Sequence, residues 1–362
     1  MPPDRIVVLG SGLIGLCTAA ALAQRGVAVT LIGERRDGEA SPAAAGMLAP
    51  GVEAAAGPAL DFGIAARDRY PAFLDWLRTA TGLAVATSRD GILQLPATPA
   101  DATRMRDDAH GDSVWLPLSD VRKLEPALSA PYGALLHEKD GWVDNAALVA
   151  ALRSYALASA EIDCVDDRAV AVEPSSDSAA VRCASGRHHT GSSVVIATGA
   201  WTRDLGGLPR SLPIVPVRGQ MIALSAAPLR HVAFGGGGYA VPRLNGETLV
   251  GSTMEHVGFD ASTTPKALTQ LRTVASAIAP AFAEAPLARH WAGLRPLTPD
   301  MQPIVGRDPD QPAVIYACGH SRNGILMAPL TADVVSALAC GEQPWYDIAP
   351  FSPTRFGPNA NH

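Results

Sequence analysis

The sequence Ile6-Val7-Val8-Leu9-Gly10-Ser11-Gly12-Leu13-Ile14-Gly15 decides the fold. Its first four residues are apolar and mostly β-branched, which predicts a buried parallel strand. An alanine-rich helical stretch follows to Arg25, and residues 27–32 predict a second buried strand. Glu34 comes just past the end of that strand. Strand, glycine turn, helix, strand and acid in this order are typical of a dinucleotide-binding βαβ unit.

Each glycine of the turn has a separate task in such a unit. Gly10 permits the tight turn, Gly12 lets a pyrophosphate approach the backbone, and Gly15 lets the helix pack on the strand. Glu34 can accept hydrogen bonds from an adenosine ribose, which favours a free 2′-hydroxyl over a 2′-phosphate. The adjacent Arg35 and Arg36 leave that preference open.

The fingerprint alone does not separate NAD from FAD. The stretch from Ser41 to Pro50 is a loop of small residues without a strand or helix pattern. Small side chains over that length suit a backbone that lies against a flat ligand, whereas a surface loop is usually more polar.

Four stretches give the chain a resemblance to a known family. They are the loop at 41–50, Val194 to Trp201, Gly293 to Gly306, and Gly319 to Pro329. The chain resembles the D-amino-acid-oxidase-like family of FAD oxidoreductases, and within it the bacterial glycine oxidases of thiamine biosynthesis. The resemblance extends from residue 5 to about residue 340. The glycine loop at 319–324 is its most specific motif.

The resemblance implies an α/β fold with two interleaved domains. A Rossmann-like FAD-binding domain of the glutathione-reductase type would use residues 1–80, 140–215 and 296–362. A substrate domain built on an antiparallel sheet, of the α+β kind, would use residues 81–139 and 216–295. Residues 61–76 and 146–158 have helical periodicity, and residues 220–224, 238–241 and 247–251 predict short strands. The glycine run at 235–238 suggests a mobile loop that could act as a lid.

Fingerprint and resemblance together assign the cofactor contacts to five segments. These are Gly10, Ser11, Gly12, Leu13, Ile14 and Gly15; Glu34 and Arg35; Ala44, Ala45, Gly46, Met47 and Leu48; Thr198, Gly199 and Trp201; and His320, Arg322, Asn323, Gly324, Ile325 and Leu326. Relatives with covalent flavin carry a cysteine shortly after the arginine segment, where this chain has residues Met301 to Ile304. We therefore expect non-covalent FAD. Ser321 stands where the family often has an aromatic residue, which leaves the substrate open.

Four residues match the family's substrate pocket. Arg295 is the candidate carboxylate clamp, because a guanidinium binds a carboxylate through two parallel hydrogen bonds. Tyr239 matches a tyrosine that helps to hold the carboxylate, and Met254 matches a pocket-lining methionine; either could also be ordinary core. Arg322 is a candidate for substrate contact or for packing on the flavin loop. No catalytic acid or base is expected, since the flavin accepts the hydride.

The resemblance implies oxidative deamination of glycine or a small D-amino acid, with oxygen as acceptor and hydrogen peroxide as a product. An alternative is a dehydrogenase of the same fold that passes electrons to a carrier. Two further hypotheses are an FAD-binding module without catalytic activity and an NAD-dependent dehydrogenase. The latter leaves the alanine-rich loop and the glycine loop at 319–324 without a role.

Composition sets outer limits on function. The 362 residues suggest about two domains at roughly 150 residues each. A net charge of −6 argues against a nucleic-acid partner. Five scattered cysteines without a CxxC motif predict reduced thiols and a cytoplasmic protein, and no histidines have metal-ligand spacing. Residues 6–23 have the length of a signal peptide, but the glycines inside the stretch and the lack of a net positive charge before it argue against one. No other segment has the length of a membrane span. Relatives suggest a homo-oligomer.

Overall fold

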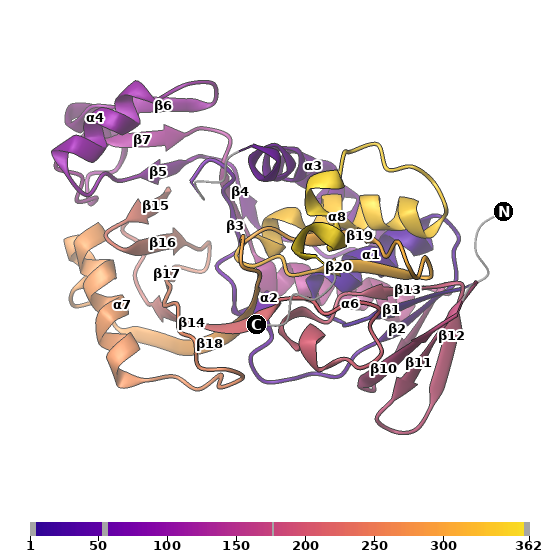
Figure 1. Ribbon diagram of the computed structural model, residues 1–362. Coiled ribbons are helices and arrows are strands. Elements are labelled where there is room, and N and C mark those ends of the chain that lie inside the picture. The colour runs from indigo at the N-terminus through magenta and orange to yellow at the C-terminus, as the bar shows by residue number, and fades with distance from the viewer. Residues whose placement is uncertain (1–4, 53–56, 176, 358–362) are drawn as a thin grey trace.

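Two large sheets organise the molecule (Figure 1). The structure is a computed structural model that describes residues 5–52, 57–175 and 177–357. A six-stranded sheet with its helices lies on the right of Figure 1, and an eight-stranded sheet lies on the left. The predicted α/β class, with a dinucleotide-type sheet and an antiparallel sheet, is confirmed.

The six-stranded sheet carries the predicted βαβ unit near its centre. Its strands, in spatial order, are β19 (Ile304–Arg307), β20 (Val314–Cys318), β13 (Ser193–Ile196), β1 (Ile6–Leu9), β2 (Val29–Ile32) and β9 (Ile162–Val165). All neighbours pair in parallel except β19, which runs antiparallel to β20. Every residue of β1 is fully buried, so this strand reads as an uninterrupted apolar run in the sequence.

Both faces of the six-stranded sheet are covered. One face packs against α1 (Leu13–Gln24), α6 (Asn145–Ala158) and α8 (Gly324–Ala339), and α3 (Pro58–Thr81) packs outside them on α6 and α8. The other face packs against a three-stranded sheet of β10 (Ala169–Pro174), β11 (Ala179–Cys183) and β12 (His188–Gly191). Side chains of β1 alternate between the two cores, with Ile6 and Val8 in the first and Val7 and Leu9 in the second.

The eight-stranded sheet joins segments that are far apart in the sequence. Its spatial order is β18 (Leu287–Leu297), β14 (Val215–Leu224), β17 (Thr248–Gly251), β16 (Gly238–Pro242), β15 (Val232–Gly235), β5 (Ile92–Gln94), β7 (Ala134–His137) and β6 (Ser113–Leu116). Pairing is antiparallel except between β15 and β5. Helix α7 (Pro265–Ile278) packs on one face of this sheet.

The remaining elements are shorter. They are α2 (Ala40–Ala43), α4 (Pro99–Asp107), α5 (Leu118–Leu124), the small sheet of β3 (Met47–Leu48), β8 (Gly141–Val143) and β4 (Thr87–Ser88), and 3₁₀ helices at Gly199–Asp204, Pro280–Phe282, Ala349–Phe351 and Pro353–Phe356. No helix in the described part of the chain is long and apolar enough to cross a bilayer.

The helices and strands expected from periodicity are present, but the glycine run at 235–238 differs from expectation. Gly236 and Gly237 have φ values of +62° and +86° and form a two-residue turn between β15 and β16. A Cβ added to Gly238 would lie 2.3 Å from the carbonyl oxygen of Gly251. The run is therefore a tight turn packed against its neighbours, and the prediction of a mobile lid loop is wrong.

The sheet memberships follow the interleaved order of the chain. The strands between residues 92 and 137 and those between 215 and 297 share the eight-stranded sheet, while the remaining long segments supply the six-stranded sheet. The exact division at 80, 140, 215 and 296 stays a prediction, since β14 and β18 run between the two bodies.

Candidate active site

One large cavity lies between the two sheets. Its lining includes the residues that follow the carboxyl ends of β1, β2, β13 and β20, together with one face of the eight-stranded sheet. In open parallel sheets this edge is where ligands bind. Most of the predicted contacts line it, namely Gly10, Ser11, Gly12, Leu13, Ile14, Glu34, Ala44, Ala45, Gly46, Met47, Thr198, Gly199, Trp201, Tyr239, Arg295, His320, Arg322, Asn323, Gly324 and Ile325.

The glycine turn after β1 is crowded on one side and open on the other. A Cβ on Gly10, where φ is +101°, would lie 2.3 Å from the carbonyl oxygen of Ala197, and one on Gly15 would lie 1.8 Å from the carbonyl oxygen of Gly10. A Cβ on Gly12 would instead meet only Ser41 Oγ, at 3.6 Å. Gly12 begins α1, whose first amide groups lack partners within the helix. This open, positively polarised edge suits a pyrophosphate.

Glu34 lies between two arginines at the end of β2. Its Oε1 is 3.6 Å from Nε of Arg36 and 3.7 Å from Nε of Arg168. Arg36 also places its guanidinium 4.7 Å from the centre of the Trp201 ring. Arg36 lines the cavity, whereas the predicted Arg35 lies outside it, in a shallow depression beside Trp291.

Arg243 fixes the small-residue loop from the opposite sheet. Its guanidinium donates to the carbonyl oxygens of Ala45 (2.8 Å) and Val143 (3.1 Å) and to Oδ1 of Asn145 (3.1 Å). Burial lowers the pKa of Arg243 to about 10. Gly46 lies so close that a Cβ there would be 2.0 Å from the carbonyl oxygen of Val143. The loop therefore keeps its shape through contacts that only small residues permit.

The loop after β20 leads directly into α8. Pro329 has no amide hydrogen, so Ile325 loses its usual donor four residues on. The buried hydroxyl of Tyr70, on α3, donates to the Ile325 carbonyl instead. His320 is buried with Nε2 3.1 Å from Oγ1 of Thr331, and burial lowers its pKa to about 3. His320 is thus neutral at ordinary pH.

Three glycines make the eight-stranded sheet flat where it faces the cavity. Gly219 on β14 is paired with Gly293 on β18, and Gly251 on β17 lies between Met221 and Tyr239 in the cross-strand register. A Cβ on Gly219 would lie 2.0 Å from Nη1 of Arg295, so the guanidinium lies directly over this glycine. A side chain at Gly293 or Gly251 would likewise collide, with Ala43 in the first case and with Tyr239 in the second.

Arg295 is held by two neutral groups. Its Nη1 donates to the carbonyl oxygen of Thr253 (3.1 Å) and its Nη2 donates to Oγ of Ser252 (2.6 Å). Within the described ranges no carboxylate pairs with it. Two of its five N–H donors are thus in use, and the others can bind an anion.

Tyr239 is buried and its hydroxyl crosses Gly251 to reach Met221, with 3.6 Å between Oη and Sδ. Sulfur is a weak acceptor, so this hydroxyl can readily donate to a ligand. Met254, the methionine predicted for the pocket, is 50% exposed and lies outside the cavity lining. Met221 lines the cavity in its place.

Three other predicted contacts also lie outside the lining. Gly15 packs against the turn, while Leu48 and Leu326 are buried in the helical core. The sequence patterns did not point to Met221, Ser252, Gly219 or the stretch from Asp167 to Val170, all of which line the cavity. Period-two alternation on residues 217–223 could have placed Gly219 and Met221 on one face.

The described residues offer neither a reactive thiol in the cavity nor a cluster of metal ligands. Cys318 lines the cavity, but burial raises the pKa of its thiol to about 12, so it stays protonated. In the part of the chain that the structure describes, no cluster of three or more His, Cys, Asp or Glu side chains could hold a metal ion.

The fold and this cavity define a dinucleotide-dependent oxidoreductase. The sequence profile of the FAD dependent oxidoreductase family (DAO) matches residues 5–338. Glycine oxidase of Pseudomonas aeruginosa is 32% identical over 97% of this chain and 98% of its own length. The bifunctional protein ThiO/ThiG of Synechocystis is 37% identical over 97% of this chain, which spans 54% of that relative. The crystal structure of glycine oxidase from Geobacillus kaustophilus superposes with a TM-score of 0.90 at 31% identity, covering 97% of this chain and 99% of that chain.

The chain belongs to the DAO family of FAD-dependent oxidoreductases. Its cofactor is therefore FAD and not NAD, and the predicted family and enzyme class are confirmed. The residues around Gly12, the loop at 43–46 and the N-terminus of α8 fit such a dinucleotide, because each presents small side chains or the positive end of a helix to the cavity.

Proposed function

We propose that this chain oxidises the amine of glycine or a small D-amino acid. The cofactor, when bound, supplies the acceptor for the hydride that leaves the substrate α-carbon. The overall reaction yields an imine, which hydrolyses to a 2-oxo acid and ammonia, while oxygen is reduced to hydrogen peroxide. The glycine oxidases among the relatives support this reaction.

Arg295 and Tyr239 orient the substrate in this proposal. The free donors of the Arg295 guanidinium bind the substrate carboxylate, and the Tyr239 hydroxyl turns from Met221 to donate to it. Fixing the carboxylate fixes which face of the α-carbon is presented to the rest of the cavity. Gly219 and Gly251, which have no side chains, let the Arg295 guanidinium and the Tyr239 ring lie directly against the sheet.

The N-terminus of α8 supports the chemistry electrostatically. Gly324 and Ile325 line the cavity at the positive end of a sixteen-residue helix. Preorganised dipoles of this kind stabilise negative charge that develops during reaction. His320 is neutral, so the stabilising field comes from the helix N-terminus and not from an imidazolium; nor is His320 placed to act as a base, since its Nε2 is occupied by Thr331.

The observation that carries the proposal is the Arg295 guanidinium. It lies in the same cavity as the dinucleotide turn, and within the described residues a carbonyl and a hydroxyl hold it without any carboxylate. Arg295 is half-buried, and a structural arginine in that position would normally be paired with an acid, because withdrawing an unpaired charge from water is costly.

Several finer assignments belong to the same proposal. FAD is bound non-covalently, as the protonated Cys318 and the segment 301–304 suggest. The chain contributes to thiamine biosynthesis, as the ThiO/ThiG relative suggests. The interleaved division at residues 80, 140, 215 and 296 is proposed, as is a homo-oligomer. A cytoplasmic location stays a prediction.

Anaerobic addition of glycine, sarcosine, D-alanine or D-proline to the purified yellow protein tests this function. We expect one of them to bleach the flavin absorbance, and readmission of air to produce hydrogen peroxide. Arg295→Lys keeps the charge but loses the fork, so its kcat/KM should fall at least about tenfold. A protein that none of the four amines reduces contradicts the proposal, and so does an Arg295→Lys variant with parental kcat/KM.

A further inference from the structure

A long connection carries the two groups that hold Arg295. The segment Ser252–Thr264, which we call the strap, joins β17 to α7 without a helix or a ladder strand of its own. Connections of this length in compact domains usually serve a function. Ser252 Oγ and the Thr253 carbonyl, both at the start of the strap, accept the hydrogen bonds of the Arg295 guanidinium.

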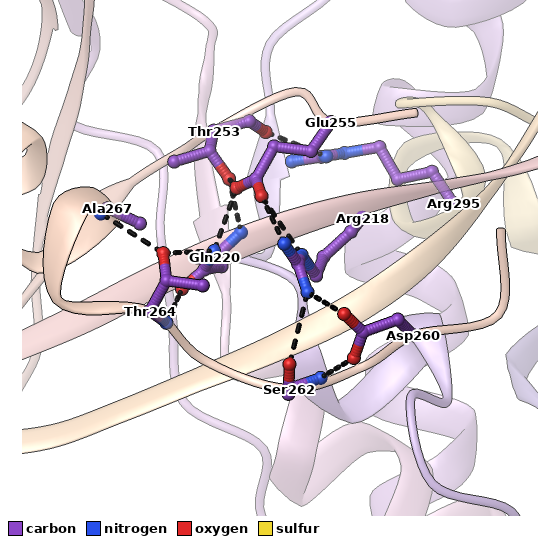
Figure 2. Close-up of polar contacts among 9 residues, drawn as sticks. All are labelled: Arg218, Gln220, Thr253, Glu255, Asp260, Ser262, Thr264, Ala267 and Arg295. Carbon is purple, nitrogen blue, oxygen red and sulfur yellow. Dashed lines mark hydrogen bonds and ion pairs between the residues drawn. The ribbon is translucent and has the colours of Figure 1, made fainter. Parts of the chain in front are cut away.

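Two buried side chains of β14 fasten the strap along its length (Figure 2). Arg218 donates to Glu255 through Nε (3.0 Å) and Nη2 (2.5 Å), and to Asp260 through Nη1 (2.5 Å). Gln220 accepts from the amide of Thr264 at Oε1 (2.8 Å). Arg218 is 4% exposed and Gln220 is fully buried. Figure 2 shows Arg218 between Glu255 on one side and Asp260 on the other.

Glu255 is the centre of this network. Its Oε2 accepts the two hydrogen bonds from Arg218, and its Oε1 accepts from Gln220 Nε2 (2.8 Å) and from Thr253 Oγ1 (2.5 Å). The Thr253 hydroxyl also accepts from the backbone amide of Gln220 (2.8 Å). Since Thr253 is held at its hydroxyl by both Glu255 and β14, its carbonyl is fixed toward Arg295 (Figure 2).

The strap also reaches the cofactor side of the cavity. The ring of Phe259 stacks on Trp201, with 6.3 Å between centroids and 14° between planes. Trp201 lines the cavity and lies under Arg36. Arg218 is buried while Glu255 and Asp260 are partly exposed, and ion pairs of either kind add little net stability although they fix one geometry. A network of this kind therefore points to position and not to stability as its contribution.

We propose that Glu255 is a positioning residue for Arg295. By holding Thr253 it sets the direction of the guanidinium, so that the unused N–H donors of Arg295 face the substrate carboxylate. The proposal rests on the proposed function, because it takes Arg295 to be the carboxylate clamp. Glu255 itself does not touch the substrate; it acts through Thr253 and Arg295.

Calorimetry of acetate binding to the FAD-loaded protein tests this positioning, because acetate carries the carboxylate but cannot be oxidised at an amine. Glu255→Ala should raise the Kd of acetate and the KM of glycine by about tenfold each, while kcat stays within about threefold. A loss of general structure would instead lower kcat and FAD content together with acetate binding.

Glu247→Ala is the matched control. Glu247 directly precedes β17, has a side chain 20% exposed against 25% for Glu255, and pairs with Arg289 away from the strap. Its removal should leave acetate binding unchanged. If Glu247→Ala weakens acetate binding as much as Glu255→Ala does, or if Glu255→Ala binds acetate like the parent, the positioning role is overturned.

Two further variants complete the test. Glu255→Gln keeps the side-chain volume and supplies one acceptor oxygen in place of two, so it should weaken acetate binding about threefold even where the alanine variant fails to fold; unchanged binding overturns the proposal. Arg295→Met separates the two proposals. If it binds acetate normally, the carboxylate clamp itself is misassigned. If it abolishes binding while the Glu255 variants do not weaken it, only the positioning role is wrong.

Discussion

Gly219→Ala should damage substrate binding while sparing the fold. A Cβ on Gly219 would lie 2.0 Å from Nη1, 2.3 Å from Nη2 and 2.4 Å from Cζ of Arg295. Ordinary contact begins at 3.4 Å, so the guanidinium has to rise by about 1.4 Å. The atoms that must move are the end of a flexible side chain, so the variant should unfold at nearly the parental temperature.

The expected loss is in substrate binding by Arg295. A displacement of that size breaks the hydrogen bonds from Arg295 to Thr253 and Ser252, which are 3.1 Å and 2.6 Å long. A hydrogen bond to a charged group contributes about 1.5–3 kcal/mol. If about 2 kcal/mol of carboxylate binding is lost, the KM of glycine rises about thirtyfold.

Steady-state oxygen consumption gives KM and kcat, and thermal unfolding followed by flavin fluorescence gives Tm. Gly246→Ala is a suitable comparison, because Gly246 has a φ of +84° in the β16–β17 turn with no atom within 4 Å of an added Cβ. That variant should lose stability and keep its KM, the reverse of Gly219→Ala. A Gly219→Ala protein with parental KM would show that Arg295 does not bind substrate in the position described.

Three other predictions concern the cofactor side of the cavity. Tyr70→Phe should lower the free energy of unfolding by about 1–2 kcal/mol in urea titrations, because the Ile325 carbonyl loses its donor; adding Pro329→Ala restores an amide there and should recover part of the loss. Burial lowers the pKa of His320 in the folded protein to about 3, whereas the pKa of a histidine in the unfolded chain is about 6.5. Between these two pH values the unfolded chain binds the extra proton, so the free energy of unfolding should fall by up to about 1.4 kcal/mol for each unit that the pH decreases. In His320→Asn this fall should be less steep. Arg243→Met removes the hydrogen bond onto Ala45 in the loop at 43–46, and with it the two that hold the guanidinium on Val143 and Asn145. The Kd of FAD should rise about tenfold in fluorescence titrations of apoprotein, and an unchanged Kd would exclude a positioning role for this arginine.

Local sequence predicted the βαβ unit because its determinants are local. An apolar run, a glycine with positive φ and a helix that packs closely at Gly15 all lie within one short stretch. The same holds for the glycine loop before α8, where the order of residues resembles one family. Neither prediction depended on which distant segments of the chain lie together in the fold.

The substrate side was harder to predict because its contacts cross the sheet. Met254 follows the strand end that the family motif marks, yet the chain turns at Ser252 and leaves Met254 exposed. Met221 reaches the cavity only because Gly251, on the neighbouring strand, has no side chain between it and Tyr239. Arg35 and Arg36 are neighbours in sequence, and the stack on Trp201 decides which of them faces the cavity. Such choices depend on register, which the sequence specifies only through the assembled sheet.

The order of strands in the six-stranded sheet has a consequence for synthesis on the ribosome. β1 and β20 flank β13, so the cavity wall joins residues near 10 to residues near 320. A nascent chain that has emerged only as far as β18 has the first glycine turn but lacks α8 and the loop before it. The emerging polypeptide therefore cannot form the complete cavity until late in translation, and flavin uptake becomes one of its last folding events.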